Sequence, residues 1–332
     1  MGNAECTRAG RLPHLPLILR NCPLPAARRL LLLRCLLPSA YCLLFLLPAA
    51  CCPLPAVFGQ VRQLTHDGGL KSDPVFVDRS GAELVFVNQA DPVTMCLMRL
   101  NLGDGQVARL RADETRSEFE PACSLDGRYR AFVRSMGNLA LALVIQDTQG
   151  GRDRELTFAQ GFSGPRSPAF SPDASRILFS FADGQQAIYS IDREGGDQRK
   201  LVDTPGICNW PSFSPDGRQL LFASTRDGNF EIYTSQADGS QPRRLTDNPR
   251  QDLRPRFSPD GRRIVFTSNR DGNYELYVMQ ADGSHLGRLT NHPERDDYAT
   301  WHPDGRQIVA VCERSGRQDL YLLPVPDVIS AK

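Results

Sequence analysis

The chain repeats itself with a period of about 44 residues, and the copies match almost letter for letter in its central part. The clearest pair is Phe-Ser-Pro-Asp-Gly-Arg, found at 213–218 and again at 257–262. Each copy is followed, at the same offsets, by Arg-Asp-Gly-Asn, Glu-Ile-Tyr or Glu-Leu-Tyr, Gln-Ala-Asp-Gly-Ser and Arg-Leu-Thr. Short apolar runs between Gly-containing turns are typical of β-hairpins. A period of this length made of strands and turns predicts a radial array of small sheets.

Two independent marks each count six units. Fainter copies of the Ser-Pro-Asp-Gly motif stand at 78–81, 124–127, 171–174 and 302–305. The leucine of the closing Leu-Thr recurs at spacings of 44 to 46 residues: Leu64, Leu110, Leu156, Leu201, Leu245 and Leu289. The first of these leucines precedes the first turn motif, whereas the last unit ends without one. We therefore predict an all-β, six-bladed β-propeller over residues 60–326, in which the N-terminal strand completes the last blade and leaves only short, protected edges.

Each unit is expected to hold four strands. In the fourth copy these are 210–214 (inner), 219–224, 230–235 and 242–246 (outer). Turn chemistry alone accounts for Ser-Pro-Asp-Gly, because Pro fixes φ and Asp accepts hydrogen bonds from the following amides, so we assign no catalysis to these aspartates. Strand direction places these turns on one side of the ring, called here the motif side. The Arg-Asp-Gly-Asn turns and the blade-to-blade connections lie on the other, the connection side.

Residues 1–59 differ from the array and are predicted to be a leader, while 327–332 form a short C-terminal tail. The leader has six Arg, no Lys and one acid, and an apolar stretch at 36–50 follows its basic part. This length fits a secretory signal better than a membrane span. Two ways of processing the leader stay open: cleavage before Gln60, or lipoprotein-type processing with Cys51 as the lipidation site. We expect a periplasmic or secreted protein, tethered to the membrane only through the leader or a lipid, with an uncleaved anchor as the alternative.

Charge and cysteine usage exclude some functions. Outside the leader, 33 Lys and Arg stand against 37 Asp and Glu, a net charge of −4 that offers no footprint for nucleic acid. The four cysteines of the array fall in different units without metal-ligand spacing: Cys96, Cys123, Cys208 and Cys312. Cys123 occupies a place that three other units give to Phe, so we predict a buried apolar filler, with a long-range disulfide as the alternative. We expect one domain and a monomer.

The sequence lacks the strong catalytic motifs. His-Glu-x-x-His, Gly-x-Ser-x-Gly, a phosphate-binding glycine loop and Cys-x-x-Cys are all missing from it. His292 precedes Asp296 and Asp297 in the segment that enters the last unit. A solvated loop is the preferred interpretation of this segment, and a metal or acid–base cluster is the alternative. We expect no cofactor, although a divalent cation bound in the channel stays open.

The connection side is the predicted binding face. Trp210, Arg254 and Tyr298 hold equivalent places at the entry to three inner strands, in a row near the channel mouth. These three residue types are the ones most enriched in binding hot spots, and loops on a rigid scaffold carry variable recognition. We assign them, together with Asp296 and Asp297, to a protein-binding face. Packing between blades is the alternative reading of the three large side chains.

The repeat Phe-Ser-Pro-Asp-Gly-Arg, Arg-Asp-Gly-Asn, Asp-Gly-Ser, Arg-Leu-Thr resembles the WD-like propeller repeat of the TolB family over about residues 61–326. The resemblance implies a six-bladed propeller that binds other proteins, as TolB binds the lipoprotein Pal in the Tol-Pal envelope system. TolB carries an α/β domain before its propeller, whereas here the leader runs almost directly into the first strand. The resemblance therefore implies a TolB-like propeller rather than TolB itself, and leaves a Tol-Pal role open.

Two functions of different classes remain. The first is a non-enzymatic module that binds an envelope protein or peptide. The second is a small propeller enzyme or carbohydrate-binding protein with a site, metal-dependent or not, in the central channel. The second needs convergent His, Asp or Glu at the starts of the inner strands. The residues at those places form a mixed set with two acids in adjacent units: Asp73, Glu120, Ser167, Trp210, Arg254 and Tyr298.

Overall fold

The computed structural model describes residues 60–158 and 164–327. The predicted leader, with Cys51 and both proposed processing sites, and the tail residues 328–332 lie outside the described residues. All 24 regular elements of the described ranges are β-strands. Within these ranges no helix is long and apolar enough to cross a membrane.

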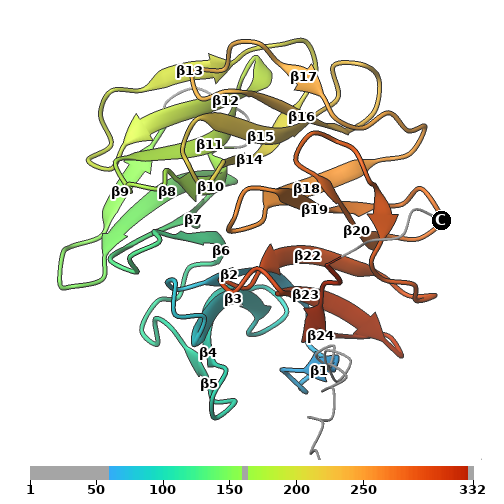
Figure 1. Cartoon of the computed structure of the whole chain (residues 1–332). Coiled ribbons are helices and arrows are strands. Elements are labelled where there is room, and N and C mark those ends of the chain that lie inside the picture. Colours follow the sequence, from blue (N-terminus) through green and yellow to red (C-terminus); the bar gives the residue numbers. More distant parts are fainter. Residues whose placement is uncertain (1–59, 159–163, 328–332) are drawn as a thin grey trace, which may run out of the picture. The chain divides into compact units, whose positions relative to one another are not determined.

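The strands form six antiparallel sheets of four, and the sheets are arranged as the blades of a propeller (Figure 1). Neighbouring inner strands contact one another all the way round, including the first against the last. Figure 1 shows these strands gathered around the centre. They are β2 (Lys71–Phe76), β6 (Glu118–Cys123), β10 (Arg166–Phe170), β14 (Cys208–Phe213), β18 (Asp252–Phe257) and β22 (Asp296–Trp301). The predicted six-bladed architecture is confirmed.

The other strands follow outward in chain order within each blade. The second strands are β3 (Glu83–Gln89), β7 (Tyr129–Gly137), β11 (Arg176–Asp183), β15 (Gln219–Ser224), β19 (Arg263–Ser268) and β23 (Gln307–Arg314). The third strands are β4 (Met95–Asn101), β8 (Ala140–Asp147), β12 (Gln185–Asp192), β16 (Glu231–Gln236), β20 (Glu275–Gln280) and β24 (Arg317–Pro324). The outer strands are β5 (Val107–Arg109), β9 (Arg154–Thr157), β13 (Arg199–Val202), β17 (Arg243–Arg244), β21 (Gly287–Arg288) and β1 (Arg62–Gln63).

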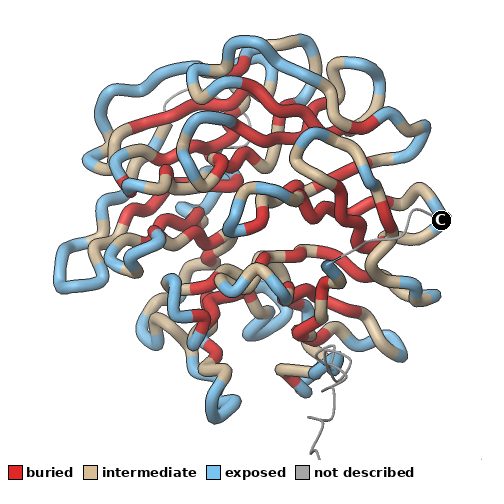
Figure 2. Tube along the Cα trace, in the orientation of Figure 1, coloured by how far each residue is buried: buried red, intermediate tan, exposed pale blue. Residues whose placement is uncertain are grey.

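Burial between blades explains why the second strands are nearly continuous apolar runs. A middle strand of a blade has a neighbouring blade on each face, so both of its faces are apolar. In β15 the four residues 220–223 are fully buried, and Figure 2 shows the same burial along the middle strands of every blade. Phe222 and Phe266 are two of the fully buried rings, and each contributes about 1.5–3 kcal/mol by leaving water.

The ring closes as the sequence predicts. β1 pairs with β24 in the sheet that also holds β23 and β22, and the Leu64 amide donates to the Leu320 carbonyl at 2.7 Å. The Thr65 hydroxyl donates to the Asp319 carboxylate at 2.8 Å and accepts from the Leu320 amide at 2.9 Å. The buried ammonium group of Lys71 lies 3.4 Å from the same carboxylate. β1 and β24 are thus joined by these buried side-chain contacts, called here the polar clamp, in addition to the strand pairing.

The same clamp gives the Leu-Thr mark a physical reason that the sequence did not supply. In the fourth blade the Thr246 hydroxyl donates to Glu231 at 2.6 Å and accepts from the Ile232 amide at 2.9 Å. Thr290 and Glu275 repeat these contacts in the fifth blade. Because β17 and β21 have only two residues each, the side-chain clamp supplies much of what attaches the outer strand.

The Ser-Pro-Asp-Gly turns behave as scaffold, as predicted. In the fourth blade the Ser214 hydroxyl donates to Asp216 at 2.5 Å, and the same carboxylate accepts from the Arg218 amide at 3.1 Å. Gly217 completes the turn at a φ of 72°. Of the four strands predicted for the fourth copy, only β15 has the predicted bounds. β14 begins at Cys208 rather than at 210, because pairing with β15 already starts there, and it ends at Phe213 rather than at 214. β16 lies one residue later than predicted, and β17 is shorter, with only two paired residues in place of 242–246.

Candidate functional site

Every inner strand carries an irregularity near its connection-side end, and one residue there adopts a left-handed backbone. The pairing of inner and second strands shifts register at this point in all six blades. The φ values run from 49° to 53° at six residues, called here the entry ring: Asp73, Glu120, Ser167, Trp210, Arg254 and Tyr298. A positive φ is costly for side chains of this size, and such bulges re-aim side chains next to functional sites. The structure therefore places strain in six places around one channel mouth.

The aromatic half of the entry ring forms a stacked row. The Arg254 guanidinium lies 4.1 Å from the centre of the Tyr298 ring and 4.9 Å from that of Trp210. It also donates to the Tyr298 hydroxyl at 3.1 Å. Burial raises the pKa of that hydroxyl above its ordinary value. Cation–π contacts of this kind contribute about 0.5–2 kcal/mol each and hold the three side chains in one arrangement.

The expectation of a solvated loop around Asp296 and Asp297 is wrong. Both carboxylates are buried, with 0% and 1% of their surface exposed, at the start of β22. Asp297 lies 3.2 Å from Arg254 and accepts from the Thr267 hydroxyl of the preceding blade at 2.8 Å. Asp296 pairs with Arg314 at 2.6 Å. Asp297 therefore holds the row, whereas Asp296 holds Arg314, and half-buried His292 accepts from the Glu294 amide at 3.1 Å.

The other half of the entry ring is acidic. Glu120 is held by Arg166 at 2.6 Å and accepts from the Ser167 amide at 2.6 Å. Asp73 has no ion-pair partner within 4 Å among the described residues. Burial, followed by repulsion from Glu120, raises the pKa of Asp73 to about 6, although Arg254 lowers it. This connection-side part of the channel is a cavity of about 190 Å³.

A second ring in the middle of the channel was missed by the sequence analysis. It is formed by the residue two places after the entry ring in each blade: Val75, Ala122, Ala169, Ser212, Arg256 and Thr300. Five of these are small, and Arg256 alone is long and charged. Laying the copies over one another at this position, as was done for the entry ring, would have singled it out. On the motif side the channel widens to a cavity of about 670 Å³, which Arg256 also lines.

The cysteine predictions need correction. All four described cysteines are unpaired, so the long-range disulfide is wrong for them. Cys123 is only partly buried and lines the channel, because β6 ends there at the place where other blades put an aromatic ring. Among the described residues, no three His, Cys, Asp or Glu side chains are arranged to hold a metal ion. Asp73 and Glu120 thus lack the third ligand that the channel-metal alternative requires.

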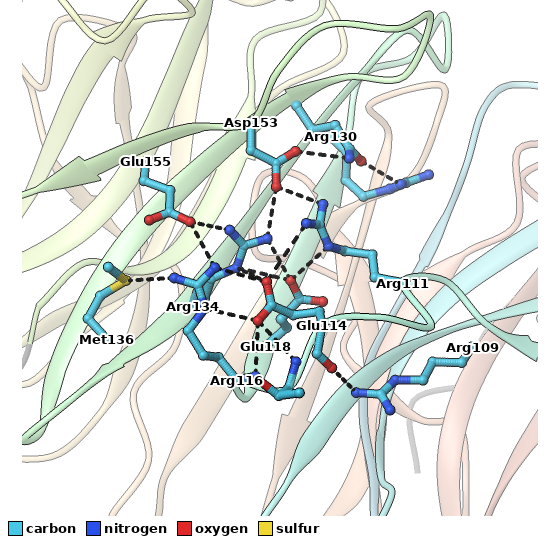
Figure 3. Close-up of polar contacts among 12 residues, drawn as sticks. Arg109, Arg111, Glu114, Arg116, Glu118, Arg130, Arg134, Met136, Asp153 and Glu155 are labelled. Carbon is cyan, nitrogen blue, oxygen red and sulfur yellow. Dashed lines mark hydrogen bonds and ion pairs between the residues drawn. The ribbon is translucent and has the colours of Figure 1, made fainter.

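An ion cluster supports the connection side between the first two blades (Figure 3). Arg134 of β7, 1% exposed, lies 2.8 Å from Glu118 and 2.9 Å from Asp153, and also pairs with Glu114 and Glu155. Hydrogen bonds from Arg116 lower the pKa of Glu114 to about 2, whereas burial raises the pKa of Glu118. No repeat pattern predicts this cluster, because its residues lie in the least regular copies.

Comparisons with known proteins agree with this geometry. Residues 103–254 match the TolB beta propeller domain, and residues 237–325 match the Tricorn protease N-terminal beta propeller domain. A TolB homolog of Chlorobium chlorochromatii is 36% identical over 107 residues, which are 32% of this chain and 23% of the homolog. The chain thus spans less than a quarter of that relative's length.

Solved structures share the fold at low identity. A structure assigned as TolB from Agrobacterium tumefaciens is 24% identical, with a TM-score of 0.62 over 80% of this chain and 94% of that one. An oligogalacturonate lyase in complex with manganese is 14% identical, with a TM-score of 0.57 over 82% and 95%. Fold and channel together define a six-bladed β-propeller with a strained, charged mouth. The matched repeats make it, more narrowly, a TolB-like β-propeller.

Proposed function

We propose that this propeller is a non-enzymatic module that binds an envelope protein or peptide at the connection-side mouth of its channel. The observation that carries the proposal is the row in which Arg254 is stacked between Trp210 and Tyr298. Three large side chains of hot-spot type are held rigid at a mouth where the backbone is strained to present them. The proposal includes the periplasm or the cell exterior as the place where the partner is met.

The row still has a free donor. The Nε of Arg254 is buried and no described residue accepts a hydrogen bond from it. A buried donor without an acceptor costs about 1–3 kcal/mol, and the free protein bears this cost. A partner contacts the parts of Trp210, Arg254 and Tyr298 that stay exposed, since all three side chains are only partly buried.

Exposed apolar side chains also favour this face. The described ranges hold eight exposed large hydrophobic residues, and strand direction assigns five of them to the connection side: Leu70, Val93, Met136, Leu139 and Ile207. Leu139 is 93% exposed at a hairpin tip with a φ of 63°, a conformation that is unfavourable for leucine. Apolar surface displayed at the expense of backbone strain is typical of an interaction surface.

The proposal is tested by capture from detergent-solubilised envelope, followed by titration of the captured partner. Arg254→Met keeps much of the side-chain volume but removes the charge and the donors. We expect a loss of about 2 kcal/mol, or roughly 30-fold in affinity. Arg218→Met is the matched control, because Arg218 is 84% exposed on the motif side.

Equal capture and equal affinity for wild type and Arg254→Met would refute the assignment of this face. A cation bound to the purified chain in a one-to-one ratio would instead support the channel-enzyme alternative. Elemental analysis of the same preparation measures this directly.

A further inference from the structure

The motif-side half of the channel has the form of a ligand site. Its cavity of about 670 Å³ lies within the range of small-molecule pockets, roughly 300–1,000 Å³. The last residue of each inner strand lines it, and five of the six are aromatic: Phe76, Cys123, Phe170, Phe213, Phe257 and Trp301. We call this cavity the motif-side cup. It is on the opposite face from the proposed protein-binding mouth.

A partly buried cation lies at the inner end of the cup. Arg256 lines both the cup and the narrower connection-side cavity. No described residue gives its guanidinium a hydrogen bond or an ion pair, and Asp73 and Glu120 act on it only at longer range. Burial lowers the pKa of Arg256, yet an arginine stays charged in proteins. The channel thus holds a positive charge without a contacting counter-ion.

A hydroxyl without a partner lies in the same ring. The Ser212 Oγ is buried and makes no hydrogen bond with any described residue, and Ser212 lines the cup together with Arg256. Leaving such a hydroxyl unsatisfied costs about 1–3 kcal/mol. A cation without a contacting acid and a buried hydroxyl without a partner thus offer donors to one acceptor in the channel.

The surroundings select the charge and shape of that acceptor. Arg166 is matched by Glu120 and Arg254 by Asp297, so Arg256 is the cation of the inner channel without an ion pair. Asp78 and Arg79 in the first motif-side turn also line the cup and add one charge of each sign. Asp73 and Glu120 offset part of the positive charge of Arg256 at longer range, and they therefore disfavour the binding of a dianion such as phosphate. A carboxylate is a monoanion that fits the planar guanidinium in a bidentate manner. The aromatic residues of the cup suit an apolar body.

We propose that the motif-side cup binds a small organic monocarboxylate. Its carboxylate lies against Arg256 and Ser212, and its apolar body lies among the aromatic side chains of the cup. The proposal does not depend on the protein-binding function, because the two sites face opposite sides and use different residues.

The two tryptophans of the chain allow each mouth to be observed separately. Trp210 belongs to the entry ring and Trp301 to the cup, and the sequence contains no other tryptophan. A Trp210→Phe protein therefore reports on the cup alone by its fluorescence. Phenylacetate is the probe. Phenylacetamide has the same apolar body without the charge, and acetate has the same carboxylate without the apolar body. Inorganic phosphate tests whether a dianion binds instead.

We expect phenylacetate to change the Trp301 emission in a saturable way. Phenylacetamide, acetate and phosphate should each bind at least tenfold more weakly. Adding Arg256→Gln should weaken phenylacetate by tenfold or more, and adding Ser212→Ala by a few-fold. No saturable change up to ~10 mM phenylacetate, equal binding of the amide, or tighter binding of phosphate would each overturn the proposal.

Thermal unfolding separates a ligand site from a structural role of Arg256. Removing a partly buried cation that has no ion-pair partner should leave the melting temperature of the Arg256→Gln protein unchanged or higher. A fall of more than ~5 °C would show that Arg256 is needed as a counter-charge for the acids of the entry ring. That result would count against the proposal even if phenylacetate binding were lost.

Discussion

Ionisation of Asp73 should destabilise this propeller at neutral pH, and Asp73→Asn should remove that effect. The pKa of Asp73 in the folded chain is raised to about 6, mainly by burial and then by Glu120. An unperturbed aspartate titrates near ~3.9. A difference of about 2 pKa units corresponds to about 3 kcal/mol.

Ionisation of Asp73 stabilises or destabilises the fold according to whether the unfolded or the folded chain binds the carboxyl proton more tightly. Because the folded pKa is raised, the folded chain holds the proton more tightly than the unfolded chain does. Its stabilising contribution is complete below about pH 4 and is lost as the pH rises through about 6. The asparagine variant, which cannot ionise, should therefore gain about 1 kcal/mol over wild type at pH 4.5 and about 3 kcal/mol at pH 7.5.

Urea unfolding of both proteins at the two pH values measures these differences. Asp203→Asn is the control, because Asp203 is exposed and paired only with Lys200 on the surface, and its effect should stay within ~0.5 kcal/mol at both pH values. A gain that is the same at pH 4.5 and pH 7.5 would show that ionisation of Asp73 is not its cause. A variant less stable than wild type at pH 7.5 would refute the reasoning, since Asp73 would then be a net stabilising charge.

Two further predictions concern buried charges elsewhere. Asp319→Asn should destabilise the ring by about 1–3 kcal/mol, because Thr65 and Lys71 lose a shared carboxylate, although Lys71 keeps Asp67 and two backbone carbonyls; a melting temperature equal to or above that of wild type would contradict this. Arg134→Met should cost about 1–3 kcal/mol at pH 7.5, because Glu118 and its neighbouring acids lose the cation they share and keep only Arg111 and Arg116. This loss should shrink at pH 4.5 as carboxylates take up protons, and thermal unfolding at the two pH values tests it, with an equal loss at both speaking against the ionic origin.

The fold was predictable because the repeat encodes it several times over. Each unit carries the turn and strand signals of one blade, and the order of the two marks at the chain ends predicts the closing strand. The same overlay of copies placed Trp210, Arg254 and Tyr298 in one row. Equivalent positions in a symmetric array must occupy equivalent places around the axis, so no knowledge of side-chain packing was required.

What the overlay could not predict depends on contacts between blades. Asp297 is buried because it packs against Arg254 and Thr267. Arg254 lies 43 positions earlier in the chain, and Thr267 belongs to the second strand of the preceding blade. The residues next to Asp297 in the sequence are polar, which is typical of a loop. The Arg134 cluster lies in a part of the array where the repeat is weak, and its acids come from both a connection and an outer strand. Such pairings require three-dimensional proximity.

The closing of the ring by β1 has a consequence for the order in which the chain folds. β1 and β24 are separated by almost the whole propeller, and joining segments about 250 residues apart in a disordered chain costs about 5 kcal/mol in loop entropy. Stacking blades one after another avoids most of this cost, because their curvature returns β22 to β2 before the ends meet. Pairing of β1 with β24 is then the final step. Until it happens, β24 is an eight-residue open edge that strands of other chains can join, so the folding chain is exposed to self-association until the two residues of β1 pair with it.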